Sequence, residues 1–143
     1  MAAPHDSADL ILKLYDLRRE PRMREARQWF IAFNPDSVDD MLATLRGPNS
    51  AHFRMVATYW DMACSLVLHG AIDEAMFNDA NGEHVAIFSK FEHLLPEYRE
   101  KTGLPHYMKS LEAVCLRLPN AKERLKATRE RLRAMAAARP AGN

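Results

Sequence analysis

Apolar residues recur at intervals of three and four positions along most of the chain, which is the spacing of amphipathic helices. This spacing predicts helices over residues 8–19, 21–33, 38–47, 51–68, 83–101, 107–118 and 121–138, with a short helical turn at 73–77. No segment shows the sustained alternation of apolar and polar residues that marks a half-buried strand. We therefore expect an all-α fold, a compact helical bundle of about six to eight helices.

Helix ends are marked by serine and proline. Ser7 is a candidate N-cap for the first helix, and Ser37 with Asp40 three residues later forms a variant of the capping box. Pro21 fits the first position of the second helix, where proline is favoured. Pro96 falls inside the segment 83–101 and predicts a kink or a break there.

The helix predicted near residues 51–69 is the most apolar one. Its first apolar stripe consists of Phe53, Val56, Ala57, Trp60, Cys64 and Val67. Its second stripe consists of Met55, Tyr59, Met62 and Leu66. Helices that are apolar over most of their circumference are central ones, so we expect this helix inside the bundle. The length suits a single helical domain over residues 1–143, with a basic C-terminal helix and frayed tail over residues 120–143.

Composition favours a soluble, cytoplasmic protein. The first residues lack the basic and apolar regions of a secretory signal. The most apolar stretch, from Met55 to Leu68, contains Asp61 and is shorter than the roughly 20 residues of a spanning helix, so we expect no transmembrane helix and no membrane partner for this stretch. Cys64 and Cys115 lie in apolar segments without a CxxC spacing, which predicts two reduced thiols in the core.

Motifs with a known chemistry are missing from the sequence. HExxH and the Glu-x-x-His of di-iron bundles are absent, so we expect no metal, although His69 with Asp73 and His93 with Glu97 have a paired-ligand spacing. The phosphate-binding motifs GxGxxG and GxxxxGK(S/T) are absent too. No motif supports an enzyme, and we favour a protein without catalytic activity and without a cofactor.

One polar arrangement stands out on the central helix. Arg54, Thr58, Asp61, Ser65 and His69 are spaced by four, three, four and four residues. At about 100° per residue these five side chains fall within roughly 80° of one another. This polar stripe is either the solvent edge of a mostly buried helix, or the lining of a pocket that holds a small polar ligand.

The C-terminal region is the basic end of the chain. Residues 104–143 carry nine basic and three acidic side chains, whereas the net charge of the whole chain is +1. The last helix has a heptad-like seam formed by Ala121, Leu125, Thr128, Leu132 and Met135. This helix is docked on the bundle, or forms an oligomer contact, or binds nucleic acid or an acidic membrane. The small net charge and the lack of aromatic residues among its basic ones argue against nucleic acid.

Arginines also cluster where the first two helices meet. The cluster consists of Arg18, Arg19, Arg22, Arg24 and Arg27. Asp16, Glu20 and Glu25 lie among them, so we expect ion pairs at i, i+3 and i, i+4 within these helices.

Three short strings resemble a group of small all-helical bacterial domains of unknown function. They are Leu14-Tyr-Asp-Leu-Arg-Arg-Glu-Pro, Tyr59-Trp-Asp-Met and His69-Gly-Ala-Ile-Asp73. The resemblance extends over residues 8–116. It implies a bacterial cytosolic protein, but it brings no activity and no functional residue with it.

Three functions follow from these observations. The first is a non-enzymatic interaction or ligand-sensing domain that self-associates through an exposed apolar edge or through the C-terminal seam. The second is a small-molecule-binding protein or enzyme that uses Arg54, Asp61 and His69 of the polar stripe. The third is weak nucleic-acid binding by the basic C-terminal helix.

Overall fold

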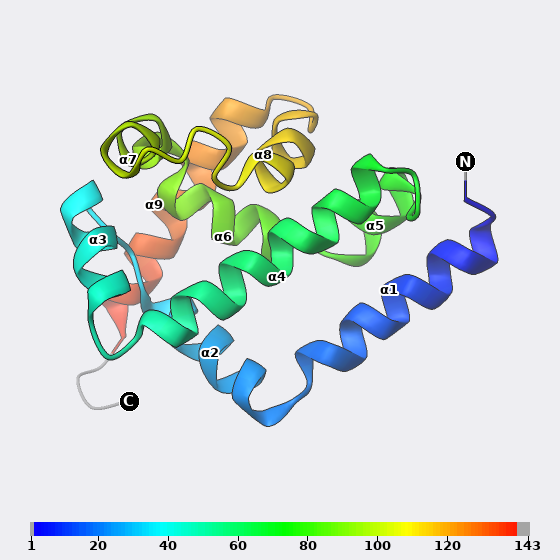
Figure 1. The fold of residues 1–143 in the computed structure, drawn as a ribbon, viewed down its shortest axis with the longest axis horizontal. Coiled ribbons are helices and arrows are strands. Elements are labelled where there is room, and N and C mark those ends of the chain that lie inside the picture. The colour runs from blue at the N-terminus through cyan, green and yellow to red at the C-terminus, as the bar shows by residue number, and fades with distance from the viewer. Residues whose placement is uncertain (1, 140–143) are drawn as a thin grey trace.

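A computed structural model describes residues 2–139, and every regular element in this range is a helix (Figure 1). The elements are α1 (Pro4–Arg18), α2 (Pro21–Ala32), α3 (Val38–Arg46), α4 (Ser50–Leu68), α5 (Glu74–Ala80), α6 (Glu83–Phe91), the 3-10 turn η1 (Glu92–Leu94), α7 (Leu95–Thr102), α8 (Lys109–Leu116) and α9 (Ala121–Ala138). The prediction of an all-α fold is confirmed. No helix of residues 2–139 is long and apolar enough to cross a membrane. The end of the predicted frayed tail, residues 140–143, lies outside the described residues.

α4 is the central helix of the fold. It crosses the structure diagonally in Figure 1 and packs against α2, α3 and α8. The first apolar stripe is buried throughout: Phe53, Val56, Ala57, Trp60, Cys64 and Val67. Truncating a buried aromatic side chain such as Phe53 or Trp60 to alanine costs about 3–5 kcal/mol. This face of α4 therefore holds the helix at the centre, as its sequence predicts.

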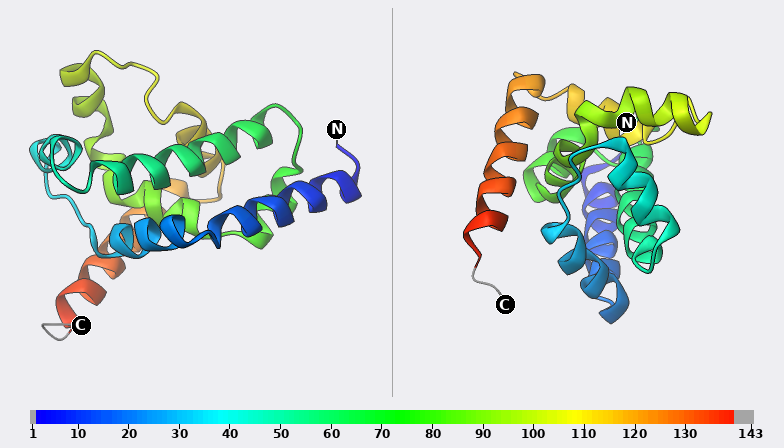
Figure 2. Two further views of the ribbon diagram at one scale, coloured as in Figure 1. Left: turned by 60° about the horizontal axis from the view of Figure 1, so that its bottom comes forward. Right: turned by 90° about the vertical axis from the view of Figure 1, so that its left-hand side faces the viewer.

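The basic helix α9 is docked on the bundle. It packs along α6 and flanks the other helices in Figure 2. Leu125 and Thr128 of the seam are buried. Arg129 donates a hydrogen bond from Nη1 to the carbonyl oxygen of Ser89 in α6 at 3.1 Å. Part of the seam and part of the positive charge are therefore used inside the chain.

The first helix begins earlier than its sequence indicates. α1 starts at Pro4, so Ser7 lies inside the helix, and the prediction of Ser7 as the N-cap was wrong. Proline is favoured at the first helical position, where its missing N–H is not needed. The buried hydroxyl of Ser7 instead accepts a hydrogen bond from the backbone N–H of Asp73 at 2.9 Å. This contact ties α1 to the start of α5.

The helix ends predicted from Ser37, Pro21 and Pro96 are confirmed, whereas the helix predicted over residues 107–118 is shorter and runs over Lys109–Leu116. Ser37 caps α3, because its Oγ accepts a hydrogen bond from the backbone N–H of Asp40 at 3.2 Å. Pro21 is the first residue of α2. The segment around Pro96 is broken, with α6 and α7 separated by η1. Because α6 ends before Pro96, the proline ring does not clash with a backbone carbonyl in the middle of a helix.

Candidate functional site

The polar stripe lies along α4, and several of its polar groups form hydrogen bonds within the protein. Arg54, Thr58 and His69 are exposed, whereas Asp61 and Ser65 are half-buried. The hydroxyl of Thr58 donates to the carbonyl oxygen of Arg54 at 2.6 Å. The hydroxyl of Ser65 donates in the same way to the carbonyl oxygen of Met62, also at 2.6 Å. Both hydroxyls therefore bond to the backbone of their own helix.

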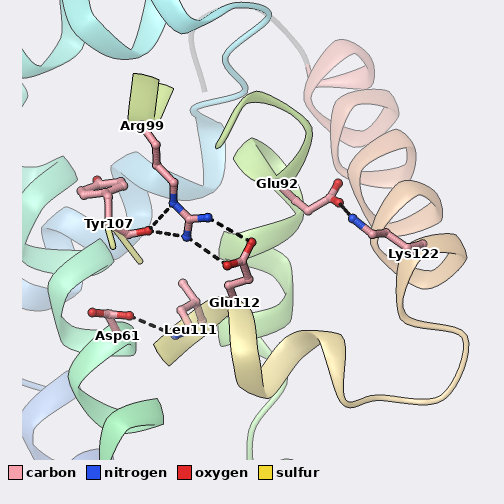
Figure 3. A network of polar contacts seen from close by, with 7 residues as sticks. All are labelled: Asp61, Glu92, Arg99, Tyr107, Leu111, Glu112 and Lys122. Carbon is pink, nitrogen blue, oxygen red and sulfur yellow. Dashed lines mark hydrogen bonds and ion pairs between the residues drawn. The ribbon is translucent and has the colours of Figure 1, made fainter. Parts of the chain in front are cut away.

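Asp61 has its partner in another helix (Figure 3). Its Oδ1 accepts a hydrogen bond from the backbone N–H of Leu111 at 2.9 Å, in the first turn of α8. The first N–H groups of a helix have no partner within that helix, so Asp61 caps α8 from outside. His69 lies one residue beyond the end of α4. A ligand bound by the five residues of the stripe remains a prediction.

The segment before α8 is held in place by Arg99 of α7 (Figure 3). Its Nη2 donates to the carbonyl oxygen of Tyr107 at 2.7 Å and to Oε1 of Glu112 at 3.0 Å. The guanidinium thus joins α7, the connecting loop and α8. These contacts place the start of α8 where Asp61 can cap it.

An apolar groove, here called the α4 groove, runs between α4 and the junction of α1 and α2. It has a volume of about 540 Å³ and is lined by Leu17, Glu20, Met23, Met55, Thr58, Tyr59 and Met62. Leu17 is 51% exposed, Met62 42% and Met55 37%. Burial raises the pKa of Tyr59 to about 12, and its protonated hydroxyl donates to the carbonyl oxygen of Leu14 in α1. Three members of the second apolar stripe thus line an open groove.

The second apolar stripe was expected to be buried, but Met55 and Met62 are exposed in one wall of the α4 groove. The other wall has no signal in the sequence. The second apolar stripe of the central helix was visible as a pattern. Leu17 and Met23 lie on opposite sides of Pro21, in two different helices. The two side chains reach one surface only because of the angle between these helices. The spacing of apolar residues along the sequence does not predict that angle.

The arginines at the junction of α1 and α2 have a partner that the sequence did not suggest. Arg27 donates from Nε to both carboxylate oxygens of Glu83, at 3.0 and 2.9 Å, and Arg18 Nη1 lies 3.6 Å from the same carboxylate. Glu83 is the first residue of α6. Glu20 instead accepts a hydrogen bond from the backbone N–H of Met23 at 2.9 Å. The expected pairing within the first two helices was therefore wrong for Arg18 and Arg27.

The two cysteines and Asp73, one of the paired-ligand candidates, have structural roles. Cys64 and Cys115 are free and buried. Burial raises the pKa of both thiols, that of Cys115 to about 12, so neither is a thiolate at neutral pH. The carboxylate of Asp73 accepts a hydrogen bond from the backbone N–H of Met76 at 2.9 Å. Across residues 2–139, no three His, Cys, Asp or Glu side chains are grouped so as to hold a metal ion.

Comparison with known proteins places the chain in a family. No curated protein and no solved structure matches it. A family model described as a domain of unknown function, DUF4760, matches residues 4–118. This range contains α1 to α8, and with them both walls of the α4 groove, whereas α9 follows it. The match agrees with the resemblance seen in the sequence, and the chain belongs to the DUF4760 family.

Proposed function

We propose that this chain is a non-enzymatic interaction domain that pairs with a second copy of itself through the α4 groove. The observation that carries the proposal is the exposure of Leu17, Met55 and Met62 around one apolar groove of about 540 Å³. Apolar side chains exposed singly are ordinary on protein surfaces, whereas a group of them in one place marks a binding surface. Removing such a surface from water favours association by about 25 cal/mol per Å².

A helix suits the shape of the α4 groove. α1 and α4 run in roughly opposite directions in Figure 1, and Met55, Tyr59 and Met62 repeat along α4 at i, i+4 and i+7. Apolar grooves between helices receive the apolar face of another helix. The flexible side chains of methionine adapt to such a face. In a second copy, α1 offers Leu17, which is 51% exposed, whereas Leu10 packs against the core of its own chain.

The charges along α1 favour an antiparallel arrangement of two copies. Asp6 and Asp9 are exposed near the start of α1, and Arg22 is exposed just beyond its end. A twofold axis across α1 would place the acidic start of one copy beside the basic end of the other. Opposite charges would then meet twice in the same interface, which favours a specific register.

The C-terminal seam offers less surface for pairing than the α4 groove does. Leu125 and Thr128 are buried against the bundle, although Met135 is 59% exposed. The middle of the seam is therefore used within the chain. The buried free thiols support the cytoplasm as the compartment of this proposal.

Size-exclusion chromatography with light scattering tests the pairing. We expect a mass that rises with concentration from 16.3 kDa towards twice this value. Met62→Glu should keep the chain at 16.3 kDa, because pairing would remove its carboxylate from water. Leu104→Glu is the matched control, since Leu104 is 49% exposed and lies outside the α4 groove. A monomer at every concentration, or equal loss of pairing in both variants, would contradict the proposal.

A further inference from the structure

A second concavity lies at the junction of α1 and α2, and we call it the arginine pocket. It has a volume of about 360 Å³ and is lined by Tyr15, Arg18, Arg19, Arg24 and Arg27. It shares no lining residue with the α4 groove. We infer that the arginine pocket binds a small molecule that carries a diphosphate group.

The arginine pocket holds more positive charge than the chain neutralises. Among residues 2–139, Glu83 is the one carboxylate paired with its arginines, 2.9 Å from Arg27 Nη2 and 3.6 Å from Arg18 Nη1. In the same part of the chain, the side chains of Arg19 and Arg24 form neither an ion pair nor a hydrogen bond. Four guanidinium groups against one carboxylate leave a surplus of three positive charges.

Arg18 is held in position by aromatic rings. Its Cζ lies 5.3 Å from the ring centroid of Tyr15 and 5.3 Å from that of Trp60, and its side chain is only 13% exposed. Its Nε is buried and has no hydrogen-bond partner in the structure of residues 2–139. A buried donor without an acceptor is costly. The aromatic rings hold the Arg18 guanidinium in place before a ligand binds, which lowers the ordering cost of binding an anion.

Diphosphate matches both the charge and the donors of the arginine pocket. Guanidinium groups bind phosphate oxygens through two parallel N–H donors. A diphosphate esterified at one end carries about three negative charges at neutral pH, because its terminal phosphate loses a second proton with a pKa of about 6. This charge equals the surplus in the pocket. A monophosphate would leave part of that surplus without a partner. The volume of about 360 Å³ also leaves room for the group to which the diphosphate is attached.

Calorimetric titration of the full chain with pyrophosphate and with inorganic phosphate tests this inference. We expect saturable one-to-one binding of pyrophosphate, at least about tenfold tighter than that of phosphate. Arg19→Gln and Arg24→Gln should each weaken pyrophosphate binding about tenfold, because each removes charge-assisted hydrogen bonds. The melting temperature should change little, since both side chains are exposed and form no ion pair or hydrogen bond within residues 2–139. Arg19 has one exposed cation–π contact, with its Cζ 5.9 Å from the ring centroid of Tyr15.

The controls separate a specific site from general attraction to positive charge. Arg22→Gln removes an exposed arginine of α2 that lies outside the pocket, and it should change the affinity less than about twofold. Glu83→Gln should tighten binding, because it frees the donors of Arg27. Met62→Glu should leave pyrophosphate binding unchanged, since Met62 lies in the α4 groove.

Three outcomes would overturn the inference. The first is no saturable binding of pyrophosphate. The second is an equal loss of affinity in Arg22→Gln and Arg24→Gln. The third is binding to vesicles of phosphatidylglycerol and phosphatidylcholine without binding to free pyrophosphate, which would identify a membrane surface as the partner.

Discussion

The carboxylate of Asp61 accepts a hydrogen bond from the backbone N–H of Leu111 at 2.9 Å, across a separation of 50 positions in the chain. α8 begins after Met108, which has a left-handed backbone and gives the helix no side-chain cap. The stabilising acceptor at this helix end therefore comes from α4. The contact gives the acidic member of the polar stripe a structural role that does not need a ligand.

Replacing Asp61 by alanine should destabilise the fold. We expect Asp61→Ala to lower the free energy of unfolding by about 1–2 kcal/mol, because an N–H group at the start of α8 loses its acceptor. Urea denaturation measures this loss. Thr58→Ala is the control, since its hydroxyl bonds only to the backbone of α4, and it should change stability by less than about 0.5 kcal/mol. Equal effects of the two substitutions would show that the Asp61 cap contributes nothing.

The buried side chain of Lys90 caps the C-terminal end of α2. Nζ of Lys90 donates to the carbonyl oxygens of Phe30, Ile31 and Phe33 at 2.9, 2.8 and 2.8 Å. The last carbonyl groups of a helix lack partners within it, and a positive charge there is favourable. Burial nevertheless lowers the pKa of Lys90 to about 8.

The lowered pKa of Lys90 makes stability depend on pH. Between pH 8 and 10.5, the unfolded chain retains a proton that the folded chain has released, so the free energy of unfolding rises with pH. Relative to Lys90→Met, the wild type should gain about 1–2 kcal/mol on going from pH 8 to pH 10. Urea denaturation of both proteins at the two pH values measures this gain. A constant difference would mean that the carbonyl groups keep the pKa of Lys90 at its ordinary value.

His84 should make the fold sensitive to acid. It is fully buried, with ring centroids 5.7 Å from Trp60 and 4.9 Å from Phe77, and its Nε2 lies 2.9 Å from Oδ1 of Asn78. Burial, with a smaller effect of the charge on Arg124, lowers its pKa from 6.5 to about 4.

Between pH 4 and pH 6.5, His84 carries a proton in the unfolded chain but not in the folded chain. The free energy of unfolding therefore falls as the pH falls from 6.5 towards 4. Relative to His84→Gln, which has no titrating ring, the wild type should lose about 1–3 kcal/mol between pH 7 and pH 4.5. Denaturation curves across this range test the sign. Parallel loss in both proteins would assign the acid sensitivity to carboxylates elsewhere in the chain.

Most helix ends could be predicted because their causes are local. Pro21 and Ser37 act on residues within one turn, and Pro96 disrupts a helix wherever it lies inside one. The N-cap predicted at Ser7 was wrong, because α1 begins at Pro4 without a side-chain cap. The hydroxyl of Ser7 therefore bonds to a distant residue, Asp73. The same residue type therefore has different roles at Ser7 and Ser37.

The candidate sites could be predicted only in part. The second apolar stripe of α4 is a periodic pattern, and it forms one wall of the α4 groove. The arginine cluster is also evident in the sequence, but the acidic residues nearest to it in the sequence are not the partners of Arg18 and Arg27. Whether a charge is neutralised depends on the whole fold, and in this structure Glu83 from α6 pairs with Arg18 and Arg27.

The helices of this protein and the buried face of its central helix follow from local patterns in its sequence. Both depend on residues a few positions apart, whose contacts follow from the period of the helix. Three contacts arise only when the chain has folded: Ser7 with Asp73, Arg27 with Glu83 and Asp61 with Leu111, across 66, 56 and 50 positions. These pairs form where separate helices pack together, and helix packing depends on the shapes of all the side chains at once.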